Sequence, residues 1–164
     1  MILTVVLIVI LCDILSKYLV VQLLAPHGQA VTLIPGVLDF DYVTNKGAAF
    51  GMLSDHRWIF MSASVVFIAC LVYVLKKSSN EHILYKVSLA MILGGGIGNM
   101  IDRIFLGYVV DFIEFTFVDF ATFNIADSAI TVGMVCLVVY FVFFDKTFFK
   151  RSGKGGEDVG NSES

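Results

Sequence analysis

Acidic, basic and amide side chains gather in one hydrophobic part of the chain, between residues 94 and 127. The candidates among them for a site are Asn99, Asp102, Arg103, Asp111, Asn124 and Asp127. They lie within or beside segments long enough to span a bilayer. A carboxylate moved toward hydrocarbon is penalised by roughly 2.5 kcal/mol or more, so each acid here is a candidate for function and requires a partner.

Helical spacing brings most of these groups together. Two sets share helix faces at spacings of three and four residues, namely Asn99 with Asp102 and Arg103, and Asn124 with Asp127. Asp111 lies in the short segment between them and can fold over both faces. Two aspartates in a low-dielectric site share one proton. Such a pair can deprotonate a water and protonate a carbonyl oxygen, which is the chemistry of aspartic peptide hydrolysis.

Structural interpretations of the same residues stay open at this point. Asn124 can cap a helix whose first turn contains Asp127, because a carboxylate suits the helix dipole there. Asp111 can be an exposed loop acid, and Asp102 with Arg103 can be a satisfied charge pair at a helix end. Spacing does not choose between these interpretations and a paired-aspartate site.

The composition indicates an integral membrane protein. Of 164 residues, 58% are hydrophobic and only 15% are charged, and the mean hydropathy is +0.88. Since each span takes about 20 residues, the chain has room for a few spans and for no large soluble domain. No basic patch interleaves with aromatic residues outside the spans, so nucleic-acid binding is not expected.

Other catalytic and metal-binding signatures are missing from the sequence. It contains no G-x-S-x-G elbow and no H-E-x-x-H helix, and its histidines fall in predicted loops. Cys12, Cys70 and Cys136 lack the spacing of a metal site or a disulfide framework. We interpret these cysteines as small apolar packing residues and expect neither a metal nor another cofactor.

The predicted fold is an all-α membrane protein with four transmembrane helices, a small extracytoplasmic β-element and an interfacial loop or helix. The predicted spans are residues 1–24, 58–75, 84–104 and 124–144. Residues 31–34 and 37–43 are rich in β-branched residues and flank Pro35-Gly36, which predicts a strand pair. Residues 105–123 are aromatic and too acidic to span, so we expect the interfacial loop or helix there. Residues 1–150 form one predicted domain, and residues 151–164 form a disordered tail.

Lysine and arginine are concentrated between the second and third spans and after the fourth. The positive-inside rule therefore places both termini in the cytoplasm and the segments around Asn45 and Asp111 outside.

In the first span, Asp13 and Lys17 are four residues apart and can pair. This pair either makes two buried charges tolerable or supports a site, and we favour support.

Two rival functions come from other classes. In a small transporter or proton-relay subunit, Asp13, Lys17, Asp102, Arg103 and Asp127 would form a charge path across the bilayer. A relay requires acids spread through the depth of the spans, whereas a peptidase site requires them to cluster at one end. An inert packing subunit is difficult to reconcile with so many intramembrane polar groups.

Five short motifs, in order, resemble those of bacterial lipoprotein signal peptidase, also called signal peptidase II. They are D-x-x-x-K at 13–17, N-K-G-A-A-F at 45–50, G-N-M-I-D-R at 98–103, V-V-D-F at 109–112 and F-N-I-A-D at 123–127. The resemblance extends from the first span to the fourth. It implies an aspartic endopeptidase of the bacterial cytoplasmic membrane that removes signal peptides from prolipoproteins, cutting before a cysteine that carries diacylglycerol.

The resemblance also assigns roles to residues. Asp111 and Asp127 would be the catalytic pair at the extracytoplasmic face. Substrate positioning and support would come from Asn45, Asn99, Asp102, Arg103 and Asn124, with Asp13 and Lys17 in the first span. The implied partners are diacylglyceryl-modified prolipoproteins and membrane lipids. One chain contains the whole site, so a monomer is sufficient.

Overall fold

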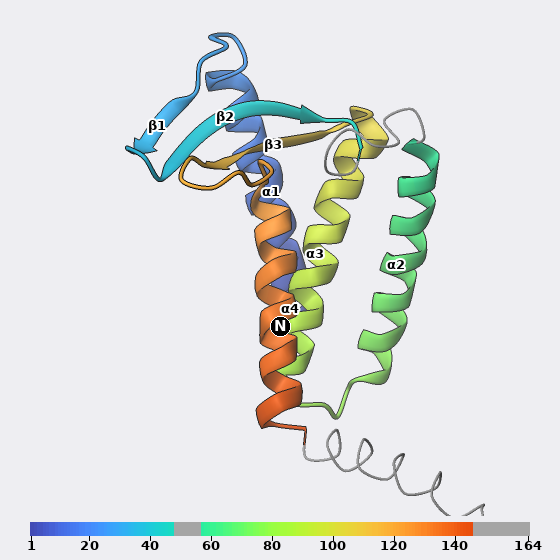
Figure 1. Cartoon of the computed structure of the whole chain (residues 1–164). Coiled ribbons are helices and arrows are strands. Elements are labelled where there is room, and N and C mark those ends of the chain that lie inside the picture. Colours follow the sequence, from blue (N-terminus) through green and yellow to red (C-terminus); the bar gives the residue numbers. More distant parts are fainter. Residues whose placement is uncertain (48–56, 146–164) are drawn as a thin grey trace, which may run out of the picture.

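Four long helices carry a small sheet at one end of the molecule (Figure 1). The computed structural model describes residues 1–47 and 57–145. Its elements are α1 (Ile2–Leu23), β1 (Val31–Ile34), β2 (Leu38–Asn45), α2 (Arg57–Lys77), α3 (Ile83–Phe105), β3 (Val109–Phe115) and α4 (Ile125–Phe143). The turn between α2 and α3 and the end of α4 lie at the end of the bundle away from the sheet (Figure 1).

The helices match the predicted spans closely, with every helix end within two residues of the predicted boundary. Within the described residues, α1, α3 and α4 are long and apolar enough to cross a membrane. Large hydrophobic side chains lie on their outer surfaces, for example Leu11 and Leu15 on α1 and Val135 and Val138 on α4. An apolar outer surface is what a helix facing lipid requires, so the protein is embedded in a membrane.

Helix α3 packs against the other three helices, and glycine makes its closest contacts possible. A Cβ atom on Gly98 would lie 2.6 Å from the Asp13 carboxylate of α1. One on Gly95 would overlap the backbone carbonyl of Ala126 at the start of α4. Small residues at a helix interface allow such close approach between membrane helices. These contacts also bring Asp13 and the start of α4 to the same part of α3.

The sheet is antiparallel in the order β1-β2-β3. The predicted strand pair is confirmed, and Pro35-Gly36 forms the turn within it. Gly36 has a φ of 73°, and the Val37 amide donates to the Ile34 carbonyl at 2.9 Å. Glycine suits this turn because a positive φ is strained for residues with a Cβ atom.

The prediction of an interfacial loop or helix at residues 105–123 was wrong in part, because Val109–Phe115 forms strand β3. Its run of Val, Ile and Phe suits a strand, but the segment pairs along β2, and a partner distant in sequence gives no local signal. The chain then turns back, and Phe123 pairs with Ile113 of β3. This return sets the start of α4 beside the strand.

Two further expectations have different outcomes. Cys12 and Cys70 are exposed on the helix surfaces, so they are not buried packing residues. An apolar side chain on a membrane helix is accommodated by lipid and needs no protein core. The predicted disordered tail and the last part of the N-K-G-A-A-F motif lie outside the described residues.

Candidate active site

Asp111 lies on β3, opposite Val43 of β2, and its side chain is only 2% exposed. Each carboxylate oxygen accepts one amide hydrogen bond. Asn45 at the end of β2 donates from Nδ2 to Oδ2 at 2.9 Å, and Asn124 donates from Nδ2 to Oδ1 at 2.6 Å. Asp111 is therefore a buried, doubly bonded acid and not an exposed loop residue.

Asp127 lies in the first turn of α4 and is half-buried. Its Oδ1 accepts from Asn99 Nδ2 at 2.8 Å, and its Oδ2 accepts from the Asn124 backbone amide at 3.3 Å. The Asn124 side chain accepts in return from the Asp127 amide at 3.0 Å, which completes a capping box. The helix-cap interpretation and the paired-aspartate interpretation are therefore compatible, because the asparagine that caps α4 also donates a hydrogen bond to Asp111.

Burial raises the pKa of Asp111 to about 6, and the nearby negative charge of Asp127 acts in the same direction. The hydrogen bonds from Asn45 and Asn124 oppose this effect because they favour the ionised carboxylate. An ordinary aspartate is almost fully ionised at pH 6. The raised pKa lets Asp111 keep its proton to a higher pH than an ordinary aspartate, so it can serve as an acid.

Further charged groups are joined to the pair through Asn99. Lys17 donates to Asp13 Oδ2 at 2.7 Å and lies 3.0 Å from Asp102 Oδ2. The same lysine donates to Asn99 Oδ1 at 3.1 Å. Asp13 Oδ1 accepts from the Ala126 amide at 3.0 Å, which ties α1 to the start of α4. The predicted Asp13–Lys17 pair is therefore present, and it is joined to the residues around the aspartates.

Arg103 and the backbone of β3 complete the cluster. Arg103 Nη1 donates to the Asn99 carbonyl at 3.4 Å, and its guanidinium lies close enough to Asp111 and Asp127 to attract both electrostatically. The Val110 amide donates to Asp102 Oδ2 at 3.1 Å, and the Val110 carbonyl accepts from Asn124. Reasoning from side-chain types missed Val110, since a backbone contact leaves no mark in the sequence.

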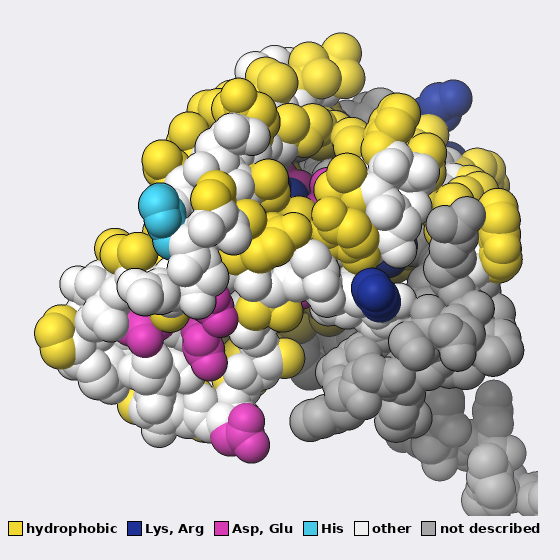
Figure 2. Space-filling model, turned by 90° about the horizontal axis from the view of Figure 1, so that it is seen from above, with side chains coloured by type: hydrophobic (Ala, Val, Ile, Leu, Met, Phe, Trp, Pro, Cys, Tyr) yellow, Lys and Arg dark blue, Asp and Glu magenta, His cyan; other side chains and the backbone are white. Residues whose placement is uncertain are grey.

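The structure brings all the predicted site residues into one connected network. It links Asp13, Lys17, Asn45, Asn99, Asp102, Arg103, Asp111, Asn124 and Asp127. Seen from the sheet end, hydrophobic side chains surround a hollow in which acidic and basic side chains are visible (Figure 2). These acids form one cluster beneath the sheet. A charge path through the depth of the helices would instead require them to be spread out.

An apolar pocket of about 350 Å³ opens beside Asp127. Its other lining residues are Phe115, Phe120, Phe123, Ser128, Thr131 and Val132. The sequence analysis did not identify Ser128, Thr131 and Val132 as residues near the site. Thr131 follows Asp127 by four residues on α4, so helical spacing could have identified it.

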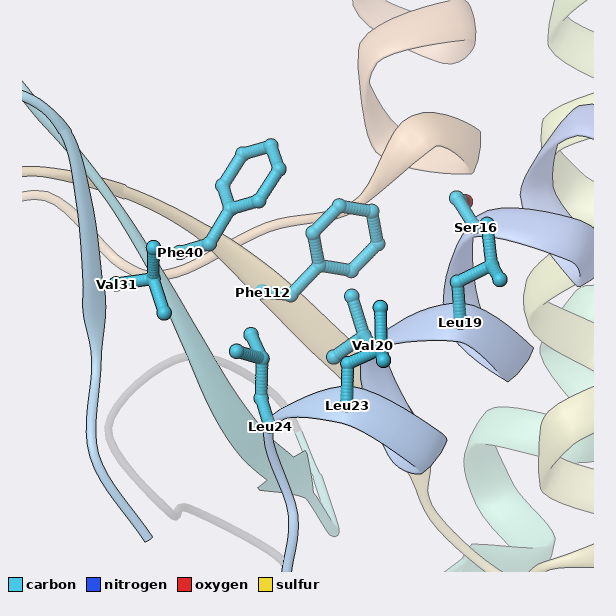
Figure 3. Close-up of a pocket in the computed structure, with 8 residues that line it drawn as sticks. All are labelled: Ser16, Leu19, Val20, Leu23, Leu24, Val31, Phe40 and Phe112. Atoms are coloured by element: carbon cyan, nitrogen blue, oxygen red, sulfur yellow. The ribbon is translucent and has the colours of Figure 1, made fainter. Parts of the chain in front are cut away.

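Phe112 lies on the other face of β3. It is buried against Phe40 with ring centroids 5.5 Å apart, and the two rings line a separate apolar pocket of about 460 Å³. Figure 3 shows this pocket between the sheet and the end of α1, where Leu19 and Leu23 line it. The alternation of side chains along a strand explains why Asp111 and Phe112 face different surroundings.

Among the described residues, no group of three or more His, Cys, Asp or Glu side chains is arranged to hold a metal ion. The groups that the site presents are two carboxyls, the amides bound to them and nearby cations. Fold and site together define a membrane-embedded helical protein in which one buried and one half-buried aspartate are hydrogen-bonded to the same asparagine beneath a small sheet.

Comparison with known proteins places the chain in a family. The model of the family described as signal peptidase (SPase) II matches residues 5–143, and the chain belongs to this family. A lipoprotein signal peptidase of Streptococcus pyogenes serotype M6 is 42% identical over 127 residues, or 77% of this chain and 83% of the relative. One of Symbiobacterium thermophilum is 40% identical over 139 residues, or 84% and 91%.

Solved structures agree with this membership. A bacterial membrane enzyme determined at 2.3 Å resolution superposes with a TM-score of 0.79 and 28% identity, covering 89% of this chain and 90% of its own. A second, determined at 1.9 Å, gives a TM-score of 0.78 and 30% identity, covering 88% and 94%. The fold is therefore shared along almost the whole chain.

Proposed function

We propose that this protein is an aspartic endopeptidase that removes signal peptides from bacterial prolipoproteins by cutting before a diacylglyceryl-modified cysteine. The family membership supports the reaction, and one observation supports the residues. Asn124 holds Asp111 through its side-chain amide and Asp127 through the capping box, so one asparagine couples two carboxyls from different elements. Asp111 and Asp127 are the proposed catalytic pair.

The unequal surroundings of the two acids suggest how they divide the reaction. Asp111 is almost completely buried and has a pKa raised to about 6, so it holds the proton and donates it to the carbonyl oxygen of the peptide. Asp127 is half-buried beside the open pocket and removes a proton from the attacking water. The water oxygen bonds to the carbonyl carbon, which gives a tetrahedral diol.

Breakdown of the diol returns both acids to their starting states. The carbon–nitrogen bond breaks, and the departing nitrogen takes the proton that Asp127 removed from water. One diol hydroxyl gives its proton back to Asp111 as the new carboxyl group forms. The positive charge of Arg103 attracts both aspartates and helps to hold an ionised carboxylate in a site with little solvent.

The pocket beside Asp127 provides an approach for a lipid-modified substrate. Phe115, Phe120 and Phe123 line one part of it, and Val132, which is 48% exposed, continues it along the outer surface of α4. An acyl chain can lie in such an apolar groove while the peptide reaches the aspartates. We propose that the diacylglyceryl cysteine approaches along this surface.

The proposed topology has four spans, with α2 as the fourth membrane-crossing helix beside α1, α3 and α4. Lys76, Lys77 and Lys86 flank the turn between α2 and α3, which supports a cytoplasmic position for that end and for both termini. The sheet and the aspartates then face the outside.

Residues 1–150 act as one domain and 151–164 as a cytoplasmic tail. A monomer is sufficient, since one chain contains every residue of the network.

The test is cleavage of a diacylglyceryl-modified prolipoprotein by purified protein in detergent. Asp111→Asn and Asp127→Asn should each lower kcat/KM by about 10²-fold or more, because each removes a proton-transfer group. Asp119→Asn, an exposed acid outside the network, is the matched control and should cleave at the wild-type rate. Full activity in either dyad variant, with folding verified by thermal melting, would exclude the assignment.

A further inference from the structure

Lys17 makes contacts that determine the orientation of its neighbours. Its ammonium group is buried, and it has three hydrogens to donate and no lone pair with which to accept. Three oxygens surround it, at 2.7 Å on Asp13, 3.0 Å on Asp102 and 3.1 Å on Asn99. Asn99 must therefore turn its amide oxygen, and not its nitrogen, toward Lys17.

The orientation of the Asn99 amide determines which of its atoms faces each of its other neighbours. Asn99 Oδ1 also accepts from Asn124 Nδ2 at 3.0 Å, and Asn99 Nδ2 points at Asp127 Oδ1 at 2.8 Å. Asn124 Oδ1 accepts from the Asp127 backbone, so its Nδ2 faces Asp111 Oδ1 at 2.6 Å. A neutral asparagine can present either end of its amide to a neighbour, but a group that only donates removes this choice.

We propose that Lys17 is a positioning residue for the aspartate pair. Its ammonium fixes the Asn99 amide directly, and the Asn99 oxygen then reinforces the orientation of Asn124 that the Asp127 backbone amide sets, so that an NH₂ group faces each carboxyl. This inference rests on the proposed function. It assigns Lys17 an effect on proton transfer, beyond neutralising Asp13 and Asp102.

The effect has a definite sign at Asp111. An NH₂ donor and a nearby positive charge both favour the ionised carboxylate, whereas a carbonyl oxygen turned toward it would favour the protonated form. Attraction from Lys17 already lowers the pKa of Asp111 against the effect of burial. Loss of Lys17 should therefore raise the pKa of Asp111. The alkaline limb of the cleavage profile, where Asp111 loses its proton, should move to higher pH.

Other charges face the pair and have to be held constant in the test. Asp13 lies on α1, and Asp102 and Arg103 lie on α3. Within the pair, Asp111 and Asp127 also act on each other electrostatically. The double variant Asp13→Asn/Lys17→Gln replaces one positive and one negative charge, so the formal net charge is unchanged. Glutamine can turn either end of its amide toward Asn99, so the orientation is no longer imposed.

The experiment compares kcat/KM from pH 4 to 9 for wild type, the double variant and Asp13→Asn, which retains Lys17. The double variant should shift its alkaline limb upward by about one pH unit, and Asp13→Asn should not shift it upward. Lys17→Arg, which also donates only, should keep the wild-type profile even if its rate falls. Equal profiles for the double variant and Asp13→Asn would overturn the proposal.

Folding failure and loss of the proposed function can be distinguished from failure of this inference. If the double variant does not fold, Lys17→Gln/Asp102→Asn provides a second charge-balanced pair. Independently, the ¹⁵N side-chain amide signals of Asn99 and Asn124 in the wild type should shift as the pH passes through about 6, where Asp111 titrates. Signals that do not respond to pH would show that the NH₂ groups do not face the carboxyls, whether or not the protein cleaves.

Discussion

The two ends of the helix bundle differ in how their polar side chains are bonded: one end has a buried network, and the other has contacts with exposed partners. Beneath the sheet, six buried polar side chains share one network, namely Asp13, Lys17, Asn99, Asp102, Asp111 and Asn124. At the other end, Tyr140 donates to the exposed Glu81 at 3.0 Å, and Lys86 donates to the Ser79 carbonyl at the surface. Water can replace those outer contacts, but it cannot replace the buried ones.

The helix caps show the difference most directly. His82 caps α3 by accepting from the Leu84 amide at 3.2 Å in an exposed position. Asn124 caps α4 and uses its remaining NH₂ group to bind Asp111, Asn99 and the Val110 carbonyl. A side-chain N-cap is therefore exposed to solvent at α3, whereas at α4 the capping side chain also holds the residues of the candidate site together. A buried polar group must be bonded, so a fully bonded cluster is also a rigid one.

The strongest way to disturb only the sheet end is to push Asp13 away from α3. Gly98→Ala places a methyl group 2.6 Å from the Asp13 carboxylate, which the buried Lys17 contact holds in place. We expect a loss of about 1–3 kcal/mol in stability and a clear fall in cleavage. Thermal melting and the peptide assay measure the two effects.

The matched control is Gly96→Ala on the same helix. A Cβ atom there would meet Ile68 at 3.8 Å, which is ordinary van der Waals contact. Since alanine is the better helix former by about 1 kcal/mol, this variant should be neutral or more stable, with normal cleavage. Equal damage from both substitutions would mean that displacement of Asp13 is not the cause.

The raised pKa of Asp111 predicts a pH dependence of stability. The folded protein binds this proton more tightly than the unfolded chain, since the pKa is about 6 instead of 3.8. Stability from this group is therefore present below about pH 4 and is lost as the pH rises to 6, by at most about 3 kcal/mol. Melting from pH 4 to 8 should show that Asp111→Asn removes this slope. An identical slope in wild type and variant would refute the prediction.

The sequence predicted the helices better than the contacts between them. Each span is a long apolar run, and intramembrane acids stand out, so the helix positions and the polar residues that meet in one network could be identified from the sequence. Strand β3 could not, because its pairing partner β2 is distant in the chain. Helical spacing likewise predicted the contact of Lys17 with Asp13, while its contacts with Asn99 and Asp102 depend on how α1 packs against α3.

The pocket beside Asp127 can be tested with two valines on α4. Val132→Trp should fill the pocket and lower kcat/KM by about tenfold, mainly through KM, because the acyl chain loses its place. Val135 is also lipid-facing, at 58% exposed, but does not line the pocket, so Val135→Trp should cleave normally. Equal kinetics for the two variants would mean that the substrate does not use this groove.

The smallest effect is expected at the opposite end of the bundle. Tyr140→Phe removes the hydrogen bond to Glu81 but keeps the ring that packs 5.1 Å from Tyr85. Because Glu81 is exposed and remains hydrated, the loss of stability should be about 0.5 kcal/mol, at the low end for a hydrogen bond. Cleavage should be unchanged in kcat and KM. A marked loss of activity would show that the two ends are coupled through α4, and the sheet end could then no longer be treated as an independently organised site.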